Sequence, residues 1–191
     1  MLLQIHEPGE TPLPHEGEKG LAVGIDLGTT NSVVAISHDQ KVEVVRDARG
    51  SGLVPSVVAY LDGGEALVGE IARRQLLDRP DIVVSSIKRL MGRGVADLQK
   101  LGGQLPYELG PAAEGGMARL KIGNRLLTPV EISADILRAV KERAELALGR
   151  NVDRAVVTVP AYFDDAARTA TRDAARLAGL EVLRLVAEPT A

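Results

Sequence analysis

The pattern of apolar and polar positions at the start of the chain predicts a small antiparallel sheet. Apolar residues dominate three short segments, at about 21–27, 32–38 and 41–46, which are joined by the tight links "GTTN" and "HDQ". Strands connected by such short links pair as antiparallel neighbours. The apolar stretch "LVPSVVAYL", residues 53–61, predicts a further strand.

The last third of the chain alternates between helical and strand patterns. Residues 128–149 begin with a capping box that carries proline at the first helical position, repeat apolar residues at helical spacing and end at a glycine. The continuous apolar run "RAVVTV" then predicts a strand covered on both faces. A second helix is expected over residues 164–179, followed by the strand "LEVLRLVA". Because a helix separates these last two strands, we expect them to be parallel.

These elements predict an α/β fold with a five-stranded mixed sheet and helices on its faces. We expect residues 21–56 and 129–191 to form this unit, and residues 57–128 to be an inserted, smaller α+β subdomain with a hairpin at Gly123-Asn124. The proline- and glycine-containing stretch 1–20 is expected to be a flexible tail.

Composition narrows the classes of protein. The 191 residues are 45% hydrophobic, carry a net charge of −3 and contain no cysteine. A slightly acidic chain without a signal-peptide pattern argues against a nucleic-acid or membrane partner, and we expect a soluble cytoplasmic protein. The lack of cysteine excludes disulfides and thiolate metal sites. The three histidines, His6, His15 and His38, show no metal-ligand spacing.

A single acid, Asp26, interrupts the first apolar strand and is followed at once by "LGTTN". A buried carboxylate is costly unless it is paired or binds a cation, although an acid that bonds its own turn is the simpler alternative. Gly28 permits a close backbone approach, and the next three residues offer hydroxyls, an amide and consecutive N–H groups to phosphate oxygens: Thr29, Thr30 and Asn31. A carboxylate behind such a loop can hold Mg²⁺ directly or through water.

Two further segments could complete a phosphoryl-transfer site. Lys88 and Arg89 are adjacent cations with apolar neighbours, and a solvated basic pair is an equally good interpretation of them alone. Glu188 precedes Pro189 at an expected helix start, where an acid favoured by the helix dipole is the simpler interpretation. Taken together with Asp26, they supply a metal anchor, a cation for a terminal phosphate and a carboxylate to orient water, which ATP hydrolysis needs.

The segments "GIDLGTTNS", "IKRLMGR", "VPAYFDDAARTATRDAARLAGLEVLRL" and "EPTA" resemble, in order and spacing, the ATPase domain of the DnaK-type seventy-kilodalton heat-shock chaperones over residues 21–191. The stretches "LLQIHEPGE", "LPYEL" and "YFDDA" are more similar to the specialised members dedicated to iron–sulfur cluster assembly than to the general chaperone. The resemblance implies an actin-like, ribonuclease-H-like fold, in which the predicted sheet is subdomain IA and the insertion is subdomain IB.

The resemblance also implies site roles, with ATP or ADP and Mg²⁺ as cofactors. Asp26 would hold Mg²⁺ through water, Lys88 would be the catalytic lysine, and Glu188 would position the attacking water. The phosphates would be held by the loop Gly28, Thr29, Thr30 and Asn31.

Three more positions acquire expectations from the resemblance alone. Pro160 and Arg168 resemble a proline switch and its arginine partner, although a strand-ending proline and an exposed helix charge are the simpler interpretations. Arg184 would lie near a surface that binds a J-domain cochaperone. Ala187 stands where the family usually has asparagine, which puts in doubt any partner contact made by that position.

The resemblance further implies that the chain is lobe I of the ATPase domain, inactive by itself, and that an iron–sulfur scaffold protein is the client of a domain outside it. Self-association through an uncovered cleft face is a related expectation. Three alternatives remain: a J-domain-binding module without catalysis, a general protein-folding chaperone of the same family, and an actin-like sugar or carboxylate kinase, against which the last two motifs argue.

Overall fold

The computed structural model describes residues 21–38, 41–100, 106–112 and 116–190. The expected tail at 1–20, with two of the three histidines, lies outside these residues. None of the helices in the described part combines the length and the apolar composition needed to cross a membrane.

A mixed sheet organises the fold, in the order β12-β11-β1-β2-β3. β1, β2 and β3 pair as antiparallel neighbours, and β11 pairs in parallel with both β1 and β12, which confirms the strand directions expected from the connections. The strand bounds are Ala22–Asp26, Asn31–His38 and Lys41–Val44 for β1 to β3, and Arg154–Val159 and Glu181–Ala187 for β11 and β12.

A sixth strand joins this sheet and corrects the expected count of five. β4 (Val54–Pro55) pairs with β2 on a side branch of the sheet. The strand is interrupted at Ser56, and the next strand, β5 (Val57–Tyr60), belongs to a different sheet. The single strand predicted over residues 53–61 is therefore wrong. Apolar periodicity cannot reveal that one continuous run is divided between two sheets.

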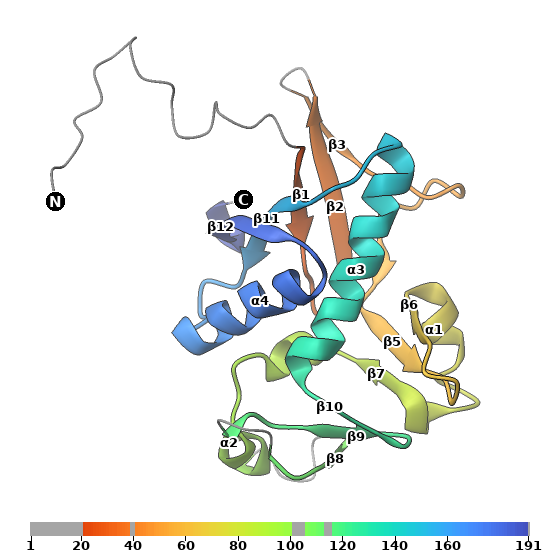
Figure 1. Cartoon of the computed structure of the whole chain (residues 1–191), viewed down its shortest axis with the longest axis vertical. Helices are drawn as coiled ribbons and strands as arrows, with labels where there is room; N and C mark the ends of the chain where they lie inside the picture. The colour runs from red at the N-terminus through yellow and green to blue at the C-terminus, as the bar shows by residue number, and fades with distance from the viewer. Residues whose placement is uncertain (1–20, 39–40, 101–105, 113–115, 191) are drawn as a thin grey trace, which may run out of the picture.

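Two helices pack against the large sheet and begin and end where local signals predict. α3 (Pro129–Leu148) starts with a complete capping box between Thr128 and Glu131 and ends at Gly149, whose φ of 65° is left-handed. α4 (Asp165–Leu177) is capped by Asp164, whose Oδ1 accepts the backbone N–H of Ala167 at 2.8 Å. α3 and α4 contact each other and lie in front of the strands in Figure 1.

These helices cover one face of the large sheet. In β11, buried residues alternate with half-buried ones, and in β1, Val23 and Ile25 are buried whereas Gly24 and Asp26 are exposed. The second face of the sheet is exposed in β1 and half-buried in β11, so the expectation of full burial for β11 is wrong. A run of β-branched residues predicts a strand but does not indicate whether one or both of its faces are covered, because packing with other elements decides this.

The segment between β4 and α3 forms two small antiparallel sheets, one in the order β6-β5-β7 and one in the order β10-β9-β8 (Figure 1). The hairpin at Gly123-Asn124 connects β9 and β10 as predicted. The bounds of these strands are Ala66–Val68, Val83–Ser85, Glu108–Leu109, Leu120–Ile122 and Arg125–Leu127 for β6 to β10. The short helices are α1 (Glu70–Arg74), η1 (Pro80–Ile82), η2 (Ile87–Leu90) and α2 (Val95–Lys100). The division of the chain into two subdomains stays a prediction.

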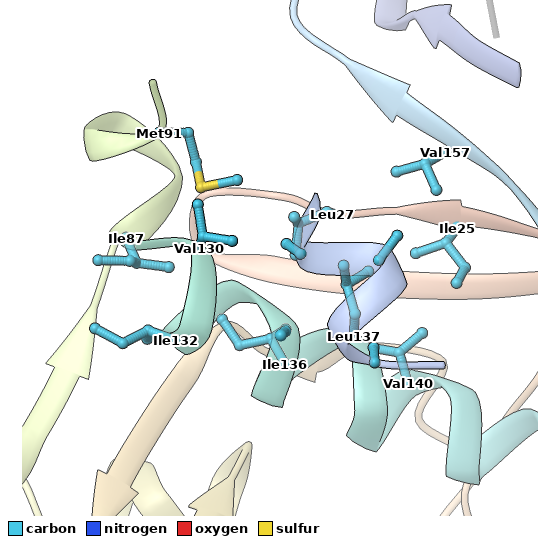
Figure 2. Packing of buried hydrophobic residues seen from close by; sticks show 14 of the residues in the cluster. Ile25, Leu27, Ile87, Met91, Val130, Ile132, Ile136, Leu137, Val140 and Val157 are labelled. Atoms are coloured by element: carbon cyan, nitrogen blue, oxygen red, sulfur yellow. The ribbon is translucent and has the colours of Figure 1, made fainter. Parts of the chain in front are cut away.

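The larger of two hydrophobic clusters among the described residues joins the large sheet to the small ones, with α3 between them. Figure 2 shows Ile87 of η2 near Val130 at the start of α3, and Ile25 of β1 near Leu137 in its middle. Aliphatic side chains and alanines dominate this core, as the scarcity of aromatic residues in the sequence requires. The η2 segment, which carries Lys88, is thus fixed to the same core as the strand that carries Asp26.

Candidate functional site

The loop between β1 and β2 closes so tightly that one position must be glycine. A Cβ atom on Gly28 would lie 2.0 Å from the carbonyl oxygen of Asn31, well inside van der Waals contact. Thr29 is half-buried and Thr30 is exposed at the bend. The predicted phosphate loop therefore has the tight backbone turn and the accessible hydroxyl residues that anion binding needs.

Asp26 lies at the end of β1, but it is exposed rather than buried, which corrects the premise that made it conspicuous in the sequence. The alternation of β1 places Ile25 and Leu27 in the core and Asp26 on the open face of the sheet. Its Oδ1 atom accepts a hydrogen bond of 2.7 Å from the hydroxyl of Thr158, its register partner on β11. Because Asp26 is exposed, it can bind a hydrated cation without a large desolvation cost.

Ser56 supports the phosphate loop from behind and was not predicted from the sequence. Its hydroxyl donates to the carbonyl oxygen of Gly28 at 2.8 Å, and its backbone N–H donates to the carbonyl oxygen of Thr30 at 2.8 Å. The hydroxyl of Ser32 lies 2.9 Å from that of Ser56, and both serines are buried. A serine inside the apolar stretch "VPSVV" is the one sequence signal that could have indicated this role.

Lys88 and Glu188 form a close ion pair across 100 residues of sequence, with Lys88 Nζ 2.6 Å from Glu188 Oε1. Lys88 is buried, with 5% of its side chain exposed, whereas 43% of the Glu188 side chain is exposed. Lys88 Nζ also lies 5.9 Å from the centre of the Phe163 ring. A buried lysine needs such partners, so the solvated basic pair suggested for this segment is wrong for Lys88, although Arg89 is exposed.

The register of the parallel strands places Asp26 and Glu188 at the same edge of the sheet. Asp26 pairs with Thr158, and Thr158 pairs with Val186, two residues before Glu188. The carboxyl ends of β1, β11 and β12 therefore meet at one edge, where α/β folds generally bind ligands. The predicted metal anchor, cation and water-orienting carboxylate are thus held by the end of β1, by η2 and by the residue after β12.

The residues predicted to relay nucleotide state are connected through Phe163. The Phe163 N–H donates to the carbonyl oxygen of Pro160 at 3.1 Å, and the carbonyl oxygen of Phe163 accepts from Arg168 Nε at 3.1 Å. Pro160 is buried directly after β11. The Phe163 ring is in the core, whereas Tyr162 is 78% exposed.

Arg184 lies apart from this cluster. It is exposed on β12, at one end of the large sheet, opposite Val156 of β11. This location is accessible to a partner, and the role proposed for Arg184 stays a prediction.

A metal site made by the protein alone is not formed in the described residues, which contain no cluster of three or more His, Asp or Glu side chains. Mg²⁺ commonly keeps several waters and uses one or two carboxylates together with substrate phosphates. The exposed carboxylate of Asp26, beside a glycine-closed loop, fits that mode of binding.

Comparison with known proteins identifies the family. The family model for "Hsp70 protein" matches residues 22–191. The chain belongs to the Hsp70 family. Its fold is accordingly that of a fragment of the Hsp70 ATPase domain, an α/β fold with a mixed sheet.

Similar curated proteins specify the branch. The chain is 54% identical over 190 residues to a "Chaperone protein HscA homolog" from Pseudomonas putida and 53% identical to the "Chaperone protein HscA" of Edwardsiella ictaluri. An HscA homolog from Azotobacter vinelandii is 52% identical. Each alignment covers 100% of this chain and 30% of the relative, so the chain spans about a third of the length of these Hsp70 proteins.

Proposed function

We propose that this chain forms lobe I of the ATPase domain of an HscA-type chaperone, which couples ATP hydrolysis to client binding in the maturation of iron–sulfur proteins in the cytoplasm. The main support is the ion pair between buried Lys88 and exposed Glu188, at the edge of the sheet where β1 ends and its glycine-closed loop begins. The ATP site is one to which other parts of a longer Hsp70 protein would also contribute.

The proposed chemistry assigns one task to each group. The N–H groups and hydroxyls of the loop Thr29–Asn31 would bind phosphate oxygens. Lys88 Nζ is a poorly hydrated cation, which would be attracted strongly to the charge on a terminal phosphate. Mg²⁺, held through water by Asp26, would neutralise phosphate charge when it is bound.

Glu188 is the best candidate for orienting the attacking water. Its side chain is 43% exposed, so one carboxylate can contact both the buried ammonium of Lys88 and solvent. When a phosphate oxygen replaces Glu188 as the partner of the Lys88 ammonium, the carboxylate of Glu188 becomes free to accept a hydrogen bond from water. The pair therefore holds the cation and the carboxylate close together before the nucleotide arrives.

The site can be tested on the 191-residue chain by NMR titration with Mg·ATP at millimolar concentration. Shifts of the amides of Thr29 and Thr30 that saturate, and that are lost in Gly28→Ala but persist in the control variant Gly24→Ala, would support the proposal. Saturating shifts confined to other residues, or no shift, would refute the assignment of the loop.

Calorimetry tests separately whether lobe I is only half of a site. We expect no measurable heat when Mg·ADP is titrated into the chain at micromolar concentration, because half of the contacts would be missing. Tight binding would show that this lobe holds nucleotide alone or as a dimer.

A second candidate function, binding of a J-domain without catalysis, is favoured by the exposure of Arg184 on β12. J-domain binding to the chain should weaken in Arg184→Ala and persist in Arg176→Ala, which removes another exposed arginine, on α4. Equal binding by the two variants would exclude this surface. A full-length protein would be needed to test whether an iron–sulfur scaffold protein is the client.

A further inference from the structure

The hydroxyl group of Tyr107 makes two hydrogen bonds to one residue of the backbone. It donates to the carbonyl oxygen of Ser85 at 2.8 Å and accepts from the N–H of Ser85 at 2.8 Å. One hydroxyl can do both, because it has one proton and two lone pairs. Ser85 is the last residue of β7, and Lys88 follows three residues later.

The position of β7 in its sheet explains why these two bonds matter. β7 is an outer strand in the order β6-β5-β7, and Ser85 pairs with Val57 of β5 on its inner side. The outer N–H and carbonyl of such a strand lack a neighbouring strand. The Tyr107 hydroxyl occupies that place and fixes Ser85 from the side opposite to β5.

The residue after Ser85 has an unusual backbone conformation. Ser86 has φ 55° and ψ 25°, and among the described residues it is the one non-glycine residue with a positive φ. A left-handed serine is strained and persists only when its surroundings determine it. This strained residue redirects the chain from β7 into η2, in which Lys88 is the second residue.

Beyond Lys88 the backbone is fixed by the core. Met91 is buried, and its sulfur accepts a hydrogen bond of 3.2 Å from the hydroxyl of Ser133 on α3. Gly92 lies so close to α4 that a Cβ atom there would be 2.4 Å from the backbone nitrogen of Ala167. The segment 86–90 is therefore held between two attachments, of which the Tyr107–Ser85 pair is the first.

We propose that Tyr107 is a positioning residue, which holds Ser86 in its left-handed conformation and thereby places the ammonium of Lys88 against Glu188. The importance of this placement for hydrolysis rests on the proposed nucleotide site. The positioning itself concerns only the backbone and the Lys88–Glu188 pair, so it can be measured without nucleotide.

The test compares Tyr107→Phe with Tyr60→Phe in the 191-residue chain. Each variant removes a hydrogen-bonded phenol hydroxyl, from half-buried Tyr107 or from buried Tyr60. The Tyr60 hydroxyl donates to Asp135 Oδ2 at 2.7 Å. Both variants are expected to lower the melting temperature, because each loses a hydroxyl group that makes hydrogen bonds within the fold. The discriminating measurement is the rate at which Lys88 is labelled by an amine-reactive reagent, determined by mass spectrometry and normalised to the exposed Lys121 in the same sample.

We expect Tyr107→Phe to raise the relative labelling rate of Lys88 roughly fivefold or more, the factor that corresponds to the loss of two hydrogen bonds of about 0.5 kcal/mol or more each. Amide exchange of Ser85 should also accelerate. Tyr60→Phe should leave both quantities at their wild-type values. Equal labelling of Lys88 in the two variants, whether both rise or neither rises, would overturn the proposal.

A double variant tests whether Tyr107 acts through Ser86. Glycine adopts the left-handed conformation without steric strain, so Ser86→Gly in the Tyr107→Phe background should return the labelling of Lys88 toward the wild-type rate. Labelling that stays as fast as in Tyr107→Phe would refute this route. If the NMR titration finds no nucleotide site while the labelling results hold, the proposed function fails and the positioning role of Tyr107 stands.

Discussion

Lys88 and Glu188 share a hydrogen bond of 2.6 Å, but the two side chains differ widely in their access to water. The lysine is 5% exposed and the glutamate is 43% exposed. Loss of either partner therefore has different consequences for the other. Without Glu188, the ammonium of Lys88 stays buried and unpaired, whereas without Lys88, the carboxylate of Glu188 can be hydrated.

This difference predicts unequal effects on stability. Glu188→Gln should lower the free energy of unfolding by about 2–4 kcal/mol, because it leaves a buried cation without its counter-ion. Lys88→Met, which retains most of the side-chain volume, should change it by less than about 1 kcal/mol. Urea denaturation of both variants checks the prediction, and equal losses would contradict the burial of Lys88.

The catalytic assignment predicts a separation of binding from turnover. In a full-length protein that contains this chain, Lys88→Ala should lower the rate of ATP hydrolysis by about a hundredfold or more, because it removes a cation aimed at the terminal phosphate. Nucleotide affinity should be largely retained, since the loop after β1 is unchanged. Single-turnover hydrolysis and fluorescent-nucleotide binding measure the two effects, and wild-type turnover would remove Lys88 from the site.

The glycine at the turn of the phosphate loop predicts a local steric effect. Gly28→Ala would place a methyl group 2.0 Å from the backbone oxygen of Asn31, and that oxygen cannot move without deforming the loop. We expect a loss of about 2–4 kcal/mol in stability, together with loss of the Mg·ATP-dependent amide shifts. The control is Gly24→Ala on the preceding strand, β1, where the nearest atom would be 3.8 Å away and little change is expected.

The buried pair Ser32–Ser56 predicts coupled energetics. Ser56→Ala removes the donor to the carbonyl of Gly28 and should cost about 1–3 kcal/mol. The double variant Ser32→Ala/Ser56→Ala should cost less than the sum of the single variants, because it no longer leaves one buried hydroxyl without its partner. A double-mutant cycle from chemical denaturation gives the coupling energy, and strict additivity would show that the two hydroxyls act independently.

A pH effect is predicted away from the site, at the end of α3. A hydrogen bond from Lys141, and a second from the N–H of Val152, lower the pKa of Glu145 below its ordinary value of 4.5. The ionised Glu145 therefore stabilises the fold above this value, and the contribution disappears as pH falls through the lowered pKa. Between about pH 6 and pH 3, the wild type should lose more stability than Glu145→Gln. Urea denaturation midpoints of the two proteins, measured across this pH range, test the prediction. A difference in stability that does not change with pH would contradict it.

The sequence predicted most reliably the features that depend on neighbouring residues. The capping box of Thr128 and the left-handed Gly149 use contacts within one or two turns, and the hairpin at Gly123-Asn124 uses a single turn. The directions of the strands in the large sheet followed from the lengths of their connections. The motifs also located Lys88 and Glu188, although their contact could not be derived from spacing alone.

Features that depend on distant packing were missed. The exposure of Asp26 follows from which face of the sheet the helices cover, and the apolar pattern does not specify that face. Ser56 contacts Gly28 from 28 residues away, and Tyr107 contacts Ser85 from 22 residues away. Serine and tyrosine hydroxyls have many possible partners, so their roles become visible only when the tertiary contacts are known.

Ser56 supports the phosphate loop, and the next residue, Val57, pairs with Ser85 at the base of the lysine segment. The phosphate loop and the lysine segment are thus joined by one peptide link and one residue pair of a β-ladder, in addition to the hydrophobic core that they share. This short connection limits how far the phosphate loop and the lysine segment can separate. A large movement of Lys88 relative to Gly28 would have to disrupt this pairing or the Ser56 hydrogen bond, so we expect the phosphate loop and the lysine segment to move as one body.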